Sequence, residues 1–183
     1  MTHRSIRRQR LVAVATGVLL TAGAALAAPA AASAAPAAAP ATTAPQATAR
    51  TQTPLVVNAR FGGHCTYDRL VIDVKGYIPT TTVTRVSELR YDGSGNKVPL
   101  AGRYFLEIRM NPAQAHNDAG QSVYKGPKLI KIYLPKLKGL AMTGDFEGYV
   151  TFGTAFNTRP EYKTFKLHNP ERWVMDVKHA NVC

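Results

Sequence analysis

Hydrophobic and polar residues alternate with a period of two through several short segments in the second half of the chain. In residues 104–110, for example, Leu106 and Ile108 alternate with Glu107 and Arg109. The clearest segments with this pattern are 104–110, 128–134, 163–168 and 172–179. Because successive side chains of a strand point to opposite faces of a sheet, the pattern predicts half-buried strands of antiparallel sheets.

Further short strands are predicted at 55–61, 69–75, 81–89 and 149–154. No segment shows a convincing helical stripe, and we expect at most one helical turn at 137–142. About eight short strands with turn residues between them are typical of a β-sandwich. We therefore predict an all-β fold, a β-sandwich of two mainly antiparallel sheets.

Two six-residue segments, 69–74 (RLVIDV) and 172–177 (RWVMDV), share arginine, valine, aspartate and valine at the same positions. In a strand, the second, fourth and sixth residues of this phrase share one face, which we assign to the core, and arginine and aspartate lie on the opposite face. Two such strands, one early and one last, fit a sandwich with pseudo-symmetric halves. The alternative is coincidence between two ordinary strands.

The segment 91–100 (YDGSGNKVPL) is rich in residues that favour tight turns and predicts a hairpin between two strands. A calcium-binding loop is excluded here, since Lys97 occupies the position that requires glycine.

The N-terminal third of the chain predicts export. Residues 1–34 combine four arginines, an apolar run and the small-residue site Ala32-Ser33-Ala34, which is typical of a cleaved secretory signal peptide. An uncleaved membrane anchor is the alternative. Residues 35–54 are rich in Ala, Pro and Thr and predict an extended linker, so residues 55–183 form the one folded domain. We expect a secreted, extracellular protein, which could associate with the cell wall, without stable membrane insertion after cleavage.

The processed chain is basic. Residues 1–34 hold four of the 23 basic residues and none of the 11 acidic ones, so removing them leaves a net charge of +8. Such a protein attracts polyanions, which outside a cell are teichoic-type wall polymers and anionic lipid head groups; a basic surface that merely keeps the protein soluble is an equal alternative. No nucleic-acid motif is present, so we expect no nucleic-acid partner.

Candidate binding residues follow from this charge and from the tyrosines near the predicted loops. Each tyrosine could instead pack inside the domain. The candidates are Lys125, Lys128, Lys131, Tyr91, Tyr124 and Tyr149.

The chain has two cysteines, Cys65 and Cys183. In an exported protein an isolated pair predicts a disulfide. A zinc site with His64 and His179 is the alternative, but His64 and Cys65 are adjacent, and neighbours in a strand point to opposite faces. We expect no metal site.

Four segments resemble the AMIN-like domain of secreted actinobacterial proteins, which is related to the AMIN domain that targets proteins to the cell envelope. The segments are 64–76, 92–116, 144–156 and 165–179. The resemblance implies a β-sandwich and a non-catalytic role in attaching proteins to the envelope, with peptidoglycan as the expected ligand. It identifies no ligand residues in this chain, and the cysteine pair is not part of the family pattern.

Catalytic patterns are weak in this sequence. Asp145 and Glu147 in "GDFEG" are the best candidate carboxylate pair for a hydrolase, although a turn with Phe146 packed inward explains them more simply. No phosphate-binding loop or dinucleotide motif is present, so we expect no cofactor. The first hypothesis is therefore a binding module, not an enzyme, whose partner is a cell-wall polymer, either peptidoglycan or a teichoic-type polyanion. The second is a secreted interaction module or inhibitor that binds another envelope protein.

Overall fold

A computed structural model describes residues 52–183. The predicted signal peptide and nearly all of the predicted linker lie outside these residues, so both stay predictions. Residues 52–183 form nine strands: β1 (Leu55–Gly63), β2 (Tyr67–Lys75), β3 (Thr80–Val86), β4 (Tyr104–Asn111), β5 (Leu129–Lys131), β6 (Leu137–Phe146), β7 (Tyr149–Phe156), β8 (Tyr162–Leu167) and β9 (Arg172–Lys178).

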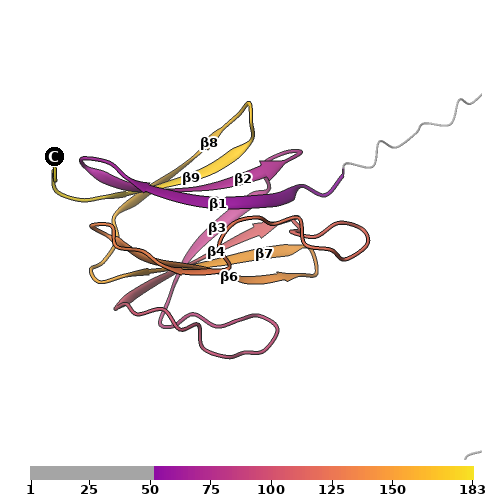
Figure 1. Ribbon diagram of the computed structural model, residues 1–183, viewed down its shortest axis with the longest axis horizontal. Coiled ribbons are helices and arrows are strands. Elements are labelled where there is room, and N and C mark those ends of the chain that lie inside the picture. The colour runs from indigo at the N-terminus through magenta and orange to yellow at the C-terminus, as the bar shows by residue number, and fades with distance from the viewer. Residues whose placement is uncertain (1–51) are drawn as a thin grey trace, which may run out of the picture. The chain divides into compact units, whose positions relative to one another are not determined.

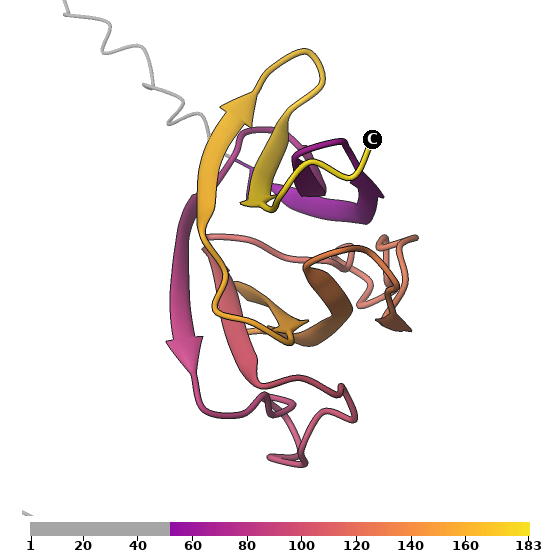
Figure 2. The same ribbon diagram turned by 90° about the vertical axis from the view of Figure 1, so that its left-hand side faces the viewer.

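The strands form two antiparallel sheets that stack as two layers (Figures 1 and 2). The first sheet has the order β1-β2-β9-β8, and the second has the order β3-β4-β7-β6-β5. Figure 1 shows the first sheet above the second, and β8 extends upwards away from the other layer. The predicted all-β fold with two antiparallel sheets is confirmed.

The main core lies between the two sheets and is built from the alternating residues of the sequence pattern. Leu106, Ile108 and Met110 of β4 are fully or almost fully buried in it, as are Phe152 and Phe156 of β7. Burial of such side chains stabilises the fold by about 1.5–3 kcal/mol each. The period of two therefore identified the inward face of β4 correctly, whereas β7 is buried on both faces and shows no such period.

The two copies of the repeated phrase are neighbours in the first sheet. β2 pairs with β9 in antiparallel register, so that Arg69 lies opposite Asp176 and Asp73 lies opposite Arg172. The expected core faces are confirmed, because the second, fourth and sixth residues of both copies are buried in the main core. The expected placement in two pseudo-symmetric halves is wrong: antiparallel pairing instead sets the arginine of one copy against the aspartate of the other.

The second sheet is covered on its outer face by residues 87–103, the connection between β3 and β4. This connection forms a second apolar cluster, in which Leu89 and Leu100 pack on the sheet. A Cβ atom added at Gly153 would lie 2.6 Å from Leu89, and one at Gly139 would lie 2.6 Å from Leu100. The glycines thus let the connection approach the sheet closely, and Figure 1 shows it below that layer.

The strand β6 corrects the expectation of at most one helical turn at 137–142. Its residues face the main core on one side and the 87–103 connection on the other, so Leu140 and Ala141 are both fully buried. A strand that is buried on both faces shows no alternation of polar and apolar residues. The period of two therefore could not reveal it.

Two further links stabilise one end of the sandwich, and the first of them joins the two sheets. The carboxylate of Asp68 on β2 is fully buried and accepts the backbone N–H groups of Lys136 (2.6 Å) and Leu137 (2.8 Å) at the start of β6. Cys65 and Cys183 form the predicted disulfide, which joins the β1–β2 turn to the C-terminal residues. Within residues 52–183, no helix is long and apolar enough to cross a membrane.

Candidate functional site

The three candidate lysines do not converge on one site. All three are exposed, but Lys125 lies beside β1 in a hollow with Asp73, and Lys128 faces a different hollow beside His116. Lys131 lies on the edge strand β5. Their closeness in sequence therefore does not translate into a shared binding surface, and their role stays a prediction.

The three candidate tyrosines have different environments. Tyr124 is buried in the main core, where its hydroxyl donates to Pro127 O at 3.1 Å, and this burial raises the pKa of its hydroxyl. Tyr91 packs against the second apolar cluster. For these two, the structure favours the packing alternative. Tyr149 is 39% exposed, and Arg109 lies 5.1 Å from its ring centre.

The carboxylates of the hydrolase hypothesis have separate roles. Asp145 accepts the backbone N–H of Ala115 (2.9 Å) and lies 2.8 Å from His116 Nδ1, so it fixes the segment that follows β4. Glu147 is exposed in the tight β6–β7 turn, where its φ of 49° and the positive φ of Gly148 produce a two-residue hairpin. The expected inward packing of Phe146 is wrong: it is 69% exposed, because it lies at the hairpin tip.

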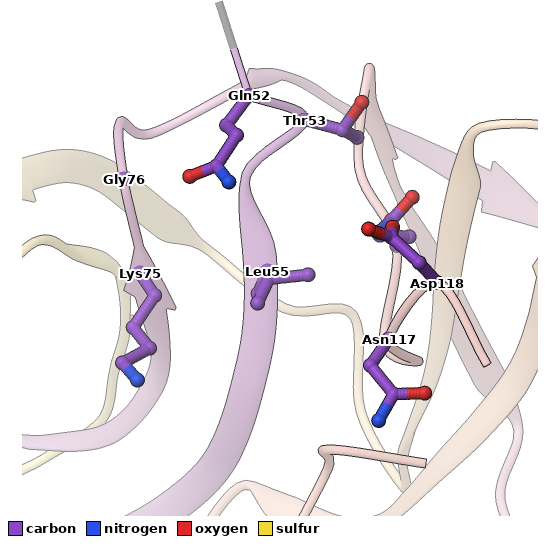
Figure 3. A pocket seen from close by; sticks show the side chains of 8 residues that line it. Gln52, Thr53, Leu55, Lys75, Gly76, Asn117 and Asp118 are labelled. Carbon is purple, nitrogen blue, oxygen red and sulfur yellow. The ribbon is translucent and has the colours of Figure 1, made fainter. Parts of the chain in front are cut away.

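One hollow of about 470 Å³ lies where β1 begins and β2 ends. Figure 3 shows Lys75 on one wall and Asn117 and Asp118 on the other, with Leu55 between them. One lysine and one aspartate across an open hollow leave no net charge to select a ligand. The hollow therefore offers no distinctive chemistry.

A different region gathers several charges on the outer face of the first sheet, where β2 and β8 begin and β9 ends. Two cross-strand rows form there. The register sets Tyr67 opposite Lys178 in one row, and in the other row it sets Arg69 and Lys163 on either side of Asp176. Glu161, whose carbonyl accepts the backbone N–H of Lys178 at 2.8 Å, continues the first row. Except for Arg69, the residues of these rows line a hollow of about 430 Å³.

The second row is organised by a bidentate ion pair. Arg69 donates from Nε and Nη2 to the two carboxylate oxygens of Asp176 at 2.7 and 2.9 Å, and Asp176 is only 2% exposed. The guanidinium also lies 5.0 Å from the ring centre of Tyr67 and 5.4 Å from that of Phe165. Hydrogen bonding to Asp176 raises the pKa of Arg69, against a partial burial that lowers it. Such a pair is rigid and oriented, so it fixes the carboxylate of Asp176, which lines the hollow.

A second hollow of about 310 Å³ adjoins the first and shares Glu161 and Lys178 with it. Its walls add Lys136, from the start of β6, and Arg159, from the connection between β7 and β8. The ammonium of Lys136 donates to Thr158 Oγ1 at 2.7 Å. We call the two hollows together the basic trough.

Most of the charge in the basic trough is not neutralised. Among the residues that the structure describes, Lys136, Arg159 and Lys178 form no ion pair, and Lys163 shares the carboxylate of Asp176 at 3.8 Å with Arg69. The trough therefore carries an excess of positive charge, and its buried carboxylate, Asp176, is already paired with Arg69. Its chemistry is that of an anion-binding surface.

Sequence reasoning missed the trough as a site. Its cations come from four separate segments of the chain, which only strand pairing brings together. The available signal was the repeated phrase, since the aspartate that its second copy places on the outer face, Asp176, lines the trough.

A comparison with protein-family models identifies the family of this domain. The model of the AMIN-like domain matches residues 54–179. The chain belongs to the AMIN-like domain family. No curated protein and no solved structure gives a match.

Membership of the AMIN-like family indicates an envelope-related binding module. The match covers both sheets and the whole basic trough except Ala180. Among residues 52–183, no group of three or more His, Cys, Asp or Glu side chains is arranged to hold a metal ion.

Proposed function

We propose that this AMIN-like protein is an exported, non-catalytic module that attaches to the cell wall through an anionic wall polymer. The observation that carries this proposal is the basic trough, whose cations have few partners within residues 52–183. A surface of this kind attracts a polyanion, and an exported protein meets polyanions in the wall. The family match supports the same location.

Sedimentation of the protein with purified cell walls tests this proposal. We expect the protein to pellet with the walls at low ionic strength and to be released as sodium chloride is raised to about 0.5 M, because salt screens exposed charges. The fraction of protein in the pellet at each salt concentration is the measurement. If the protein stays in solution at every salt concentration, wall attachment is wrong.

A second candidate function, binding to another envelope protein, is supported by the β6–β7 hairpin. Phe146 and Tyr149 lie opposite each other there and are 69% and 39% exposed, and Arg109 lies over the tyrosine ring. Exposed aromatic residues beside an arginine are typical of protein interface hot spots. Cross-linking on intact cells with a photoreactive residue at position 146 would capture a protein partner. A signal restricted to wall polymer would exclude this second function.

A further inference from the structure

We propose that the basic trough binds a phosphodiester polymer, such as a chain of alditol phosphates, and that Glu161 limits the affinity for it. This inference rests on the proposed attachment to the wall and names the ligand chemistry and the residues. The first hollow, on the outer face of the first sheet, and the second, which reaches the start of β6, share Glu161 and Lys178. The two hollows therefore adjoin, and the four cations that line them suit a chain with repeated charges better than a single small anion.

The kinds of cation in the trough favour phosphate over carboxylate. Planar, bidentate recognition of a carboxylate requires a free guanidinium, and the trough offers one, Arg159, because that of Arg69 is already occupied by Asp176. Three of the four other cations are lysines, namely Lys136, Lys163 and Lys178. A lysine ammonium is a compact point charge that contacts phosphate oxygens without a fixed orientation. A mobile polymer with one negative charge at each phosphodiester fits this arrangement.

Tyr67 supplies the contact for the uncharged part of such a chain. The Tyr67 ring is stacked on the ring of His64, with 4.4 Å between the two ring centres. The guanidinium of Arg69 lies over the same ring, 5.0 Å from its centre. The Tyr67 ring is therefore held in place before a ligand arrives. The part of Tyr67 that lines the first hollow supplies an apolar contact for the carbon backbone of an alditol or a sugar.

Glu161 opposes the ligand at the centre of the trough. It is exposed, it lines both hollows, and among residues 52–183 it forms no ion pair. A carboxylate at this position repels each phosphate that passes it. Its removal should therefore strengthen binding, whereas removal of a structural side chain would not.

The first experiment compares intact walls with walls from which hydrofluoric acid has removed the phosphodiester polymers. We expect the protein to bind intact walls and to lose most of this binding after the treatment. Soluble poly(glycerol phosphate) should compete for binding to intact walls, and an uncharged glycan should not. Equal binding to both wall preparations would overturn the phosphodiester inference and leave wall attachment in place. No binding to either preparation would overturn both.

The second experiment locates the site with charge-matched variants. The double variant Lys163→Gln/Lys178→Gln removes two trough cations, and Arg85→Gln/Arg103→Gln removes two exposed cations at the second sheet. We expect the trough variant to bind intact walls roughly tenfold more weakly and with a shallower salt dependence, as loss of two phosphate contacts predicts. The matched control should change less than about twofold, and Glu161→Gln should bind more tightly. Equal losses in the two double variants, or weaker binding by Glu161→Gln, would contradict the inference.

Discussion

At the scale of single residues, Asp68 is the most consequential polar side chain of the described domain. It belongs to a strand of the first sheet, yet one of its oxygens accepts two backbone N–H groups from the second sheet. Its other oxygen lies 3.3 Å from Nε2 of the buried His179. A buried carboxylate is tolerated when several donors surround it, and here these donors also join the two layers. The basic trough depends on this link, because Lys136 is one of the residues that Asp68 holds.

We predict that Asp68→Ala lowers the free energy of unfolding by about 2–4 kcal/mol, because it leaves two backbone N–H groups buried without an acceptor. Urea denaturation followed by tryptophan fluorescence measures this change, since Trp173 lies in the main core. The control is Asp118→Ala, which changes an exposed aspartate. A loss below about 0.5 kcal/mol, as for a surface substitution, would show that the inter-sheet hydrogen bonds contribute little.

At the scale of elements, the second sheet depends on the close approach of the 87–103 connection. Leu89 and Leu100 occupy space that side chains at Gly153 and Gly139 would fill. The connection thereby acts as a third layer over part of that sheet, and it buries β6 and β7 on both faces.

We predict that Gly153→Ala destabilises the protein by about 1–3 kcal/mol through overpacking against Leu89. The double variant Gly153→Ala/Leu89→Ala should be less destabilised than the sum of the two single variants, because the smaller side chain makes room for the new methyl group. Thermal unfolding of the four proteins gives this coupling. Gly62→Ala is the control, since a Cβ there would meet no atom within 4 Å. Strict additivity would contradict the proposed contact.

The elements differ in how well the sequence predicts them. β4 and β9 carry one apolar and one polar face, so the period of two located them within a residue or so of their ends. β6 has apolar or small residues on both faces, and the 87–103 connection that causes this lies far away in the sequence. Phe165 shows a related limit of the sequence pattern. The period of two correctly separated Phe165 from its polar neighbours on β8, but the face that it occupies is the outer one, where it packs beside Arg69 and not in the core. Period alone does not say which of two faces is covered.

At the scale of the whole molecule, the disulfide between Cys65 and Cys183 fixes the C-terminal residues beside the β1–β2 turn. The two cysteines are 118 residues apart, so the cross-link restricts nearly the whole described domain in its unfolded state. Cysteine count and predicted export were sufficient to predict this pair. The basic trough was not predictable in the same way, because Lys136, Arg159, Lys163 and Lys178 meet only after both sheets have formed.

We predict that Cys65→Ser/Cys183→Ser lowers the free energy of unfolding by up to about 4–5 kcal/mol, the value that loop-closure entropy assigns to a loop of this length. The circular dichroism spectrum should keep its β-sheet form below the new transition. Guanidinium denaturation of the variant and of the oxidised protein measures the difference. A change below about 1 kcal/mol would show that the unfolded chain is already compact without the cross-link.

The pairing of the repeated phrase has a consequence for biogenesis. The early copy lies at residues 69–74 and its partner at 172–177, so the middle of the first sheet joins segments about a hundred residues apart. A polypeptide emerging amino end first would present a β1–β2 hairpin without its neighbour, and with Leu70 and Ile72 bare, until Arg172 and the residues after it had followed. Any product truncated before that point would lack Asp176 and with it the counter-ion of Arg69. The first sheet and the Asp176 side of the basic trough can thus form only once the chain is complete to its last strand.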